Sequence, residues 1–129
     1  MPELKKILYA DDEPDIRDIV ALTLSSLGGF DVKACENGAD AIAAAGTFKP
    51  DLILLDVMMP GLTGPESLSV LRGEEATAMT PAIFITAKAR PEEVEELIQH
   101  TRTGIITKPF DPMRLPDEVK SIWARLSSE

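Results

Sequence analysis

Five polar side chains that could take part in phosphoryl chemistry stand at the ends of short apolar runs. They are Asp11, Asp12, Asp56, Thr86 and Lys108. Carboxylate oxygens are the ligands that a hard divalent cation such as Mg²⁺ prefers. A lysine ammonium and a threonine hydroxyl can hold the oxygens of a phosphoryl group, whose transfer depends mostly on positioning and charge neutralisation. If these five side chains meet in one place, they predict a Mg²⁺-dependent phosphoryl-transfer site.

Each of these residues also has an ordinary interpretation. Taken alone, Asp11 and Asp12 are typical of a solvated turn. Thr86 is typical of a strand, and Lys108 of a surface lysine at a strand end. Asp56 is harder to explain in this way, because it interrupts an apolar run and a lone buried carboxylate is costly in free energy. The coincidence of all five residues with the ends of apolar runs favours a shared site.

The apolar runs have the length of strands and alternate with longer segments of helical periodicity. The segment Leu52–Leu55 is continuously apolar, as expected for a strand that is covered on both faces. The five runs are Ile7–Ala10, Phe30–Cys35, Leu52–Val57, Ala82–Thr86 and Gly104–Thr107. This alternation predicts an α/β fold in which five helices cover both faces of a doubly wound, five-stranded parallel sheet.

Four of the intervening segments carry apolar residues at helical spacing. These stripes are Ile16, Ile19, Val20, Leu24 and Leu27; Ala41, Ile42 and Ala45; Val94, Leu97 and Ile98; and Leu115, Val119, Ile122, Trp123 and Leu126. Pro14, Pro65 and Pro91 fall near the starts of predicted helices, where a missing backbone N–H has no cost.

The order of the strands decides whether the acidic residues meet. We assume the flavodoxin-like order 2-1-3-4-5, in which the first and third strands are neighbours where the order reverses. Ligands bind outside the carboxyl ends of the strands at that point. Asp11, Asp12 and Asp56 would then share one crevice, where they repel each other unless a cation is present or one of them is protonated.

Composition and charge restrict the class of protein further. The chain has 129 residues, of which 44% are hydrophobic, and this is ordinary for one globular domain. The formal net charge of −9 argues against nucleic acid or a membrane surface as a direct partner.

Cys35 is the single cysteine, so no internal disulfide can form, and it is interpreted as a small packed residue. The apolar run near the N-terminus is too short for a signal peptide, which predicts a cytoplasmic protein.

Four motifs, in this order and spacing, resemble the receiver domain of two-component response regulators from Lys6 to Leu126. They are Ala10-Asp11-Asp12-Glu13, Leu54-Leu55-Asp56-Val57-Met58-Met59-Pro60-Gly61, Ile85-Thr86-Ala87 and Thr107-Lys108-Pro109-Phe110. The resemblance implies a single, stand-alone receiver domain over residues 1–129 with no output domain, like the chemotaxis receivers. It also implies a signalling protein rather than an enzyme, one that catalyses only its own phosphorylation and dephosphorylation.

The resemblance also implies a role for each site residue. Asp56 is expected to accept a phosphoryl group from a phosphohistidine. The expected direct Mg²⁺ ligands are Asp12, Asp56 and the backbone carbonyl of Met58, with Asp11 binding through water. The phosphoryl oxygens are expected to contact Thr86, Lys108 and the amide of Ala87, and the Lys108–Pro109 peptide bond is expected to be cis.

The partners implied by the resemblance are a sensor histidine kinase, a histidine phosphotransfer protein, or both. A downstream protein is expected at the face formed by the fourth helix, the fifth strand and the fifth helix, and the chain is expected to be a monomer or a transient dimer. The resemblance leaves open whether the domain relays phosphate, drains it from a kinase or binds a target.

The chain departs from the family pattern in two places. Ile105 occupies the place of a frequent aromatic switch residue, and Thr101-Arg102-Thr103 replaces a frequent Ala-Gly-Ala. Isoleucine has a stiff side chain and no polar tip. We therefore expect activation to depend mainly on the loop Ala87–Arg90, although a simple core role for Ile105 fits the sequence equally well.

Other functional classes fit less well. A haloacid-dehalogenase-like phosphatase needs a second acid two positions after its nucleophile, where this chain has Met58. A nucleotide-binding domain would have a glycine-rich turn after the first strand, where this chain has Asp11-Asp12-Glu13-Pro14. A receiver-shaped scaffold that is never phosphorylated would have lost one of the site residues, and all of them are present.

Overall fold

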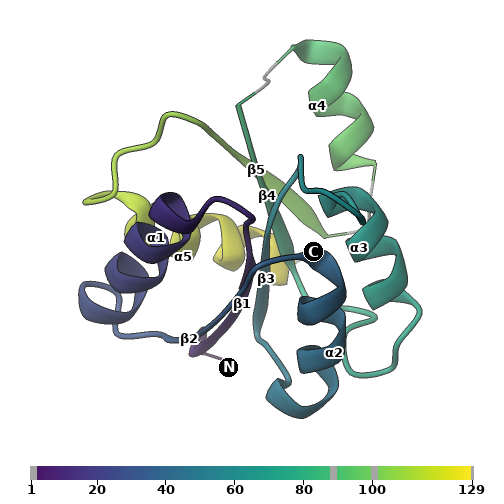
Figure 1. The fold of residues 1–129 in the computed structure, drawn as a ribbon. Helices are drawn as coiled ribbons and strands as arrows, with labels where there is room; N and C mark the ends of the chain where they lie inside the picture. Colours follow the sequence, from purple (N-terminus) through teal and green to yellow (C-terminus); the bar gives the residue numbers. More distant parts are fainter. Residues whose placement is uncertain (1–2, 88–89, 100–101, 129) are drawn as a thin grey trace.

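A computed structural model describes residues 3–87, 90–99 and 102–128. Its centre is one parallel sheet with strand order β2-β1-β3-β4-β5, so the predicted order is confirmed (Figure 1). The strands are β1 (Lys6–Ala10), β2 (Asp31–Cys35), β3 (Leu52–Asp56), β4 (Ala82–Thr86) and β5 (Thr103–Thr107). Each lies within a residue or two of its predicted run.

Five helices cover the two faces of this sheet. They are α1 (Pro14–Ser26), α2 (Gly38–Phe48), α3 (Gly64–Arg72), α4 (Pro91–Ile98) and α5 (Leu115–Ser127). Helices α1 and α5 lie on one face, and α2 and α3 lie on the other (Figure 1). The doubly wound arrangement predicted from the alternating runs is therefore confirmed.

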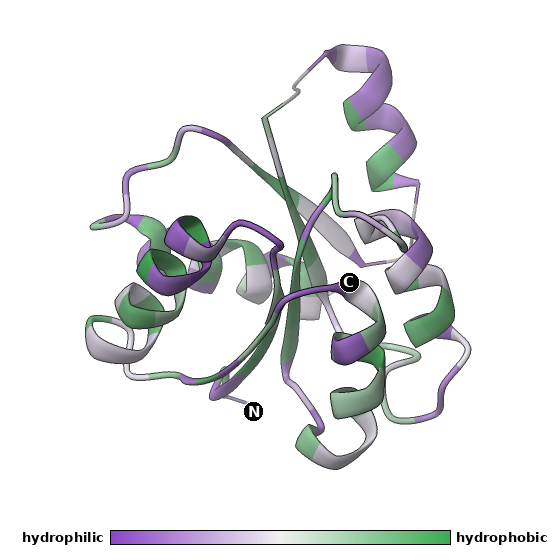
Figure 2. Ribbon diagram, in the orientation of Figure 1, coloured by the Kyte–Doolittle hydropathy of each residue, from purple (hydrophilic) through white to green (hydrophobic). Residues whose placement is uncertain are grey.

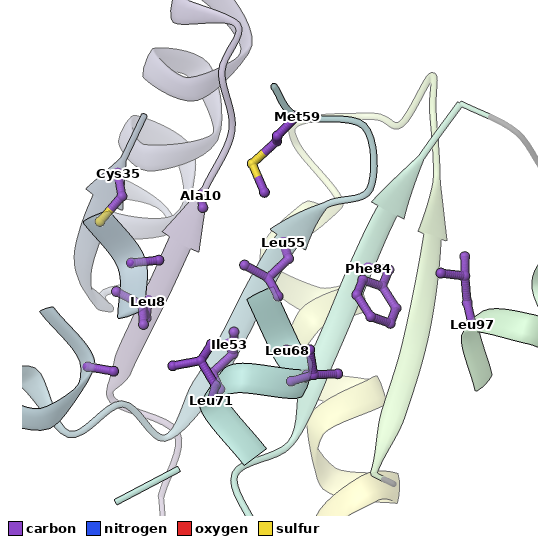
Figure 3. Packing of buried hydrophobic residues seen from close by; sticks show 13 residues of the cluster. Leu8, Ala10, Cys35, Ile53, Leu55, Met59, Leu68, Leu71, Phe84 and Leu97 are labelled. Atoms are coloured by element: carbon purple, nitrogen blue, oxygen red, sulfur yellow. The ribbon is translucent and has the colours of Figure 1, made fainter. Parts of the chain in front are cut away.

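Two buried clusters form the core, one on each face of the sheet. Along β1 the side chains alternate: Ile7 and Tyr9 pack toward α1 and α5, while Leu8 and Ala10 pack toward α2 and α3. Figure 3 shows the second of these clusters, in which Leu68 and Leu71 lie against the strands. In Figure 2 the central strands are predominantly apolar, whereas much of α4 is hydrophilic. All residues of β3 and β4 are buried, as their continuous apolar runs predicted.

Local sequence signals account for where several helices begin. Thr63 and Glu66 form a capping box, in which each side chain accepts a hydrogen bond from the other residue's backbone N–H. Pro14, Pro65 and Pro91 each occupy one of the first two positions of a helix, as predicted.

Two of the predicted apolar stripes are only partly buried. Ile19 is 48% exposed and Leu27 is 56% exposed, although both belong to the first predicted stripe, and Ile98 of the stripe in α4 is 50% exposed. Leu27 lies beyond the end of the helix at Ser26, and the buried residues of α1 are confined to Val20, Thr23 and Leu24. Cys35 is buried, in agreement with its predicted packing role. None of the helices built from the described residues has the length and apolar character that crossing a bilayer would require.

Candidate functional site

The parallel register brings the acidic residues together at the carboxyl ends of the strands. Ala10 on β1 is the register partner of Leu55 on β3, so the acids that follow them, Asp11 and Asp56, are neighbours. One carboxylate oxygen from each of Asp11, Asp12 and Asp56 lies within 4.8 Å of the others. The predicted crevice of three carboxylates is thus present in the structure.

A glycine lets the loop after β3 return close to the end of that strand. A Cβ atom at Gly64 would lie 2.5 Å from the backbone oxygen of Asp56, a distance that real Cβ atoms do not adopt. The Gly64 N–H also donates to the carbonyl oxygen of Val57 at 2.9 Å. Gly64 therefore allows α3 to begin directly against the acidic residue that ends β3.

Asp11 is held in place by hydrogen bonds to both of its carboxylate oxygens. The Tyr9 hydroxyl donates to Oδ2 at 2.8 Å, and the Glu13 backbone N–H donates to Oδ1 at 3.0 Å. The Arg17 guanidinium donates to the backbone carbonyl of Asp11 at 2.9 Å. Asp11 is fully buried, so these donors replace the water that the carboxylate would otherwise bind.

Lys108 supplies the positive charge in the crevice. Its Nζ atom lies 3.4 Å from Asp56 Oδ1, 3.8 Å from Asp11 Oδ2 and 3.8 Å from Glu13 Oε1. The Lys108 backbone N–H donates to the Thr86 carbonyl at 2.8 Å, which fixes the loop after β5 beside the end of β4. The Lys108–Pro109 peptide bond is cis, as the resemblance implied. A single ammonium group is thus shared among three carboxylates.

The environment of Asp56 works against its ionisation. Burial, and after it the negative charge of Asp11, raise the pKa of this carboxyl from 3.8 to about 6. The ammonium of Lys108 opposes this rise in the pKa without cancelling it. Asp56 is therefore a carboxylate that a cation would stabilise strongly in its charged form.

The remaining predicted residues lie at or just after the carboxyl ends of β3 and β4. Thr86 is buried at the end of β4, and Ala87 follows it in an exposed position. Met58 lies in the loop between β3 and α3, with its side chain largely exposed. Lys88 and Ala89, in the middle of the predicted activation loop, and Thr101 lie outside the described residues.

The donor set fits a hard divalent cation. Three carboxylates provide only oxygen ligands, and their mutual repulsion is relieved when a cation binds between them. The neighbouring lysine and threonine, Lys108 and Thr86, add the groups that phosphoryl oxygens require. The arrangement is suited to transferring a phosphoryl group to a carboxylate.

The comparisons with known proteins agree with this geometry. The family model for the response regulator receiver domain matches residues 7–120. The chain belongs to this family. Binding of Mg²⁺ and phosphorylation of an aspartate are general features of receiver domains in two-component systems.

Similar proteins include both transcriptional regulators and a chemotaxis protein. The chain is 37% identical over 121 residues to the phosphate regulon transcriptional regulatory protein PhoB of Pseudomonas aeruginosa, covering 94% of this chain and 52% of PhoB. It is 38% identical over 123 residues to the alkaline phosphatase synthesis transcriptional regulatory protein PhoP of Bacillus subtilis, covering 94% of this chain and 49% of PhoP. The chain thus spans about half the length of these curated relatives.

The solved structure of the chemotaxis response regulator CheY4 of Vibrio cholerae is also similar. Its TM-score to this receiver domain is 0.86 at 32% identity, and the match covers 93% of this chain and 99% of CheY4. The flavodoxin-like fold predicted from the sequence is therefore shared with a solved receiver.

Sequence reasoning did not identify three residues of the site. Tyr9, Glu13 and Arg17 all contact Asp11 or Lys108, yet none was assigned a role in it. The position of Tyr9 did contain a signal. It lies two residues before Asp11 on an expected strand, and side chains two residues apart on a strand lie on the same face.

Proposed function

We propose that this receiver domain accepts a phosphoryl group from a phosphohistidine on Asp56 and signals through the resulting change in conformation. The observation that carries this proposal is the burial of Asp56 beside Asp11 and Asp12, with Lys108 Nζ 3.4 Å away. In this role Asp12, Asp56 and the Met58 carbonyl would hold Mg²⁺, with Asp11 contributing through water. When bound, Mg²⁺ neutralises the charge of the carboxylates and of the phosphoryl oxygens.

The chain's own residues divide the remaining work. An ionised Asp56 oxygen attacks phosphorus; the new O–P bond forms as the N–P bond of the phosphohistidine breaks, and the released imidazole takes up a proton from solvent. Lys108 then pairs with a phosphoryl oxygen, and the Thr86 hydroxyl and Ala87 amide donate to the others.

Intact mass spectrometry tests the acceptor directly. With Mg²⁺ and a small phosphodonor such as phosphoramidate, the wild-type chain should gain one phosphoryl group, and Asp56→Asn should gain none. Asp31→Asn is a matched control, because Asp31 is exposed at the start of β2, far from the crevice. Labelling of Asp56→Asn equal to that of the wild type would rule out Asp56 as the acceptor.

A protein donor needs a surface beside the crevice, and an apolar pocket adjoins Lys108 there. Ile16 and Ile19 of α1 line it together with Pro109, Phe110 and Pro112 of the loop before α5. We assign this surface to the phosphohistidine protein, because a donor that rests on it can present its imidazole to Asp56. The partial exposure of Ile19 then has a function.

Ile19→Glu tests this assignment separately from the chemistry. The variant should accept phosphate from phosphoramidate at the wild-type rate but lose transfer from its cognate histidine kinase or phosphotransfer protein. Val70→Glu, which places the same charge on exposed α3, should retain both activities. A profile of transfer from the host's kinases and phosphotransfer proteins identifies the cognate donor. Undiminished transfer to Ile19→Glu from that donor would show that the donor docks elsewhere.

The output of the phosphorylated domain is assigned to the face formed by α4, β5 and α5. Helix α4 carries Glu92, Glu93, Glu95 and Glu96. A downstream protein, or a second copy in a transient dimer, would have to present basic groups to this helix. A pull-down with beryllofluoride-treated protein tests the surface, since Glu92→Lys should then lose a partner that the wild type retains.

A further inference from the structure

The chain contains one tyrosine, and its hydroxyl lies in the phosphorylation site. We propose that Tyr9 is a positioning residue, which orients the Asp11 carboxylate for Mg²⁺ and keeps Lys108 directed toward Asp56. This inference rests on the proposed function of the crevice. It assigns a role to a strand residue that touches neither phosphorus nor metal directly.

The tyrosine ring is fixed by the core. Tyr9 is fully buried in the middle of the sheet, with Ala34 of β2 and Leu54 of β3 as register partners. Its ring belongs to the cluster that packs against α1 and α5. A tyrosine has two side-chain torsions, so a packed ring leaves its hydroxyl little freedom. The oxygen 2.8 Å from Asp11 Oδ2 is therefore a rigid donor.

Tyr9 completes the set of bonds around Asp11. The Asp11 N–H donates to the Cys35 carbonyl, and the Asp11 carbonyl accepts from Arg17. The Glu13 backbone N–H donates to Oδ1, and the Tyr9 hydroxyl donates to Oδ2. Each carboxylate oxygen still has a lone pair for a metal-bound water. The carboxylate plane is thus set before any cation arrives, and such fixed partners of ligands raise metal affinity.

The same oxygen also faces Lys108. Asp11 Oδ2 lies 3.8 Å from Lys108 Nζ, farther than the 3.4 Å that separates Nζ from Asp56 Oδ1. Because the Tyr9 hydroxyl already donates to Oδ2, this oxygen attracts the ammonium less strongly. Without the hydroxyl, the Asp11 carboxylate would turn toward Lys108 and draw the ammonium away from Asp56. Tyr9 therefore affects both the metal ligands and the group that contacts the phosphoryl oxygen.

The competing explanation is that Tyr9 only fills the core, and that its hydroxyl donates to Asp11 because this is the nearest acceptor. Tyr9→Phe separates the two, because it preserves the ring. A positioning role predicts that the dissociation constant for Mg²⁺, measured from amide chemical shifts, rises about tenfold. A core role alone predicts lower stability with an unchanged dissociation constant.

Thr77→Val is the matched control for losing a buried hydroxyl. Thr77 is fully buried between α3 and β4, and its hydroxyl donates to the Leu71 carbonyl away from the crevice. This variant should lose stability and bind Mg²⁺ as the wild type does. A dissociation constant within a factor of about two of the wild type for Tyr9→Phe would overturn the inference.

A second readout does not depend on any variant folding. Since Tyr9 is the single tyrosine, a ¹³Cζ label on tyrosine gives one resonance. Adding Mg²⁺ to the wild-type protein should shift this resonance with the same midpoint as the amide shifts of Asp12. If the amides show that Mg²⁺ binds but the Tyr9 resonance stays fixed, only the role of Tyr9 fails. If neither responds to Mg²⁺, the metal site of the proposed function fails.

Discussion

Asp56 stands between two opposing electrostatic influences, and their balance determines what the site does without a metal. Burial and the charge of Asp11 raise its pKa, while Lys108 lowers it, and the result is a pKa of about 6. Asp12 adds a smaller repulsion, and Glu13 competes for the same ammonium. Near neutral pH the free site therefore holds more negative charge than one lysine can balance. The cost of that charge is offset when a cation binds.

Replacing Asp56 should consequently stabilise the metal-free protein. The folded-state pKa is raised above the ordinary value of 3.8, so the folded state binds the proton more tightly between about pH 4 and 6. Stability is lost as pH rises through this window. Asp56→Asn removes this loss. At about 1.4 kcal/mol per pKa unit, the substitution should raise the free energy of unfolding at pH 7.5 by at most about 3 kcal/mol.

Urea unfolding in the presence of a chelator measures this effect. The gain in Asp56→Asn should shrink toward zero as the pH falls to about 3, where Asp56 is protonated in both states of the wild type. Asp31→Asn, on an exposed position, should show no such dependence. A gain that is the same at pH 7.5 and pH 3 would show that the introduced amide acts through packing instead.

A variant of Lys108 should separate acceptance of the phosphoryl group from the change in conformation that follows it. If its ammonium pairs with the phosphoryl group after transfer, Lys108→Ala should still accept phosphate on Asp56 but fail to adopt the activated conformation. Thr86→Ala should show the same defect more mildly, since it loses one hydrogen bond worth about 1 kcal/mol net. Intact mass measures the first property, and amide shifts with beryllofluoride measure the second. Activated shifts in phosphorylated Lys108→Ala would contradict this role.

At the scale of elements, the strands were predicted more accurately than the helices. A strand buried on both faces leaves a continuous apolar run, and Leu52–Leu55 has no other good explanation. A helix needs only a few buried positions, so the exposed Ile19 looked like part of a stripe. The predicted stripes did not include α3, although the Thr63 and Glu66 capping box marks its start.

The site was predictable where it depends on strand ends, and not where it depends on side-chain direction. Asp11 and Asp56 meet because parallel strands bring their carboxyl ends to one edge of the sheet. Strand alternation places Tyr9 on the same face as Asp11. Whether its hydroxyl reaches that carboxylate, and whether Glu13 reaches Lys108, depends on side-chain torsions that no residue pattern records. The positions that tune the site are therefore harder to find than the positions that form it.

The conformational change that links the crevice to α4 on activation should not require Ile105 to move. This residue is partly buried on β5 and packs against the core cluster that includes Leu97 of α4. A stiff, packed isoleucine gains little by changing its position. Activation should therefore act through the segment after Thr86 and through the first turn of α4. With beryllofluoride, the amides of Ala87, Arg90, Glu92 and Glu93 should shift, while the Ile105 methyl resonances should stay in place. A large shift of the Ile105 methyls would show that this residue moves despite lacking an aromatic ring.

At the scale of the whole molecule, the acidic crevice and the single tryptophan lie at opposite ends of the sheet. Trp123 Nε1 donates to the Asp51 carbonyl at 2.9 Å, and Asp51 directly precedes β3. Asp56 ends that same strand of five residues, so roughly 16 Å of extended chain separates the two ends. Tryptophan fluorescence therefore reports on unfolding of the whole domain rather than on events in the crevice.

Mg²⁺ should accordingly raise global stability without quenching native tryptophan fluorescence. A ligand that binds only the folded state stabilises it by about 2.7 kcal/mol at a concentration one hundred times its dissociation constant. The urea midpoint reported by Trp123 should rise with Mg²⁺, while the emission of the folded protein stays nearly constant.

In Asp12→Asn, the metal-free midpoint should hold or rise because repulsion is relieved, and its response to Mg²⁺ should weaken because a ligand is lost. A marked loss of metal-free stability in this variant would mean that the acids are structural, and strong quenching of the native protein by Mg²⁺ would place the cation near Trp123 instead.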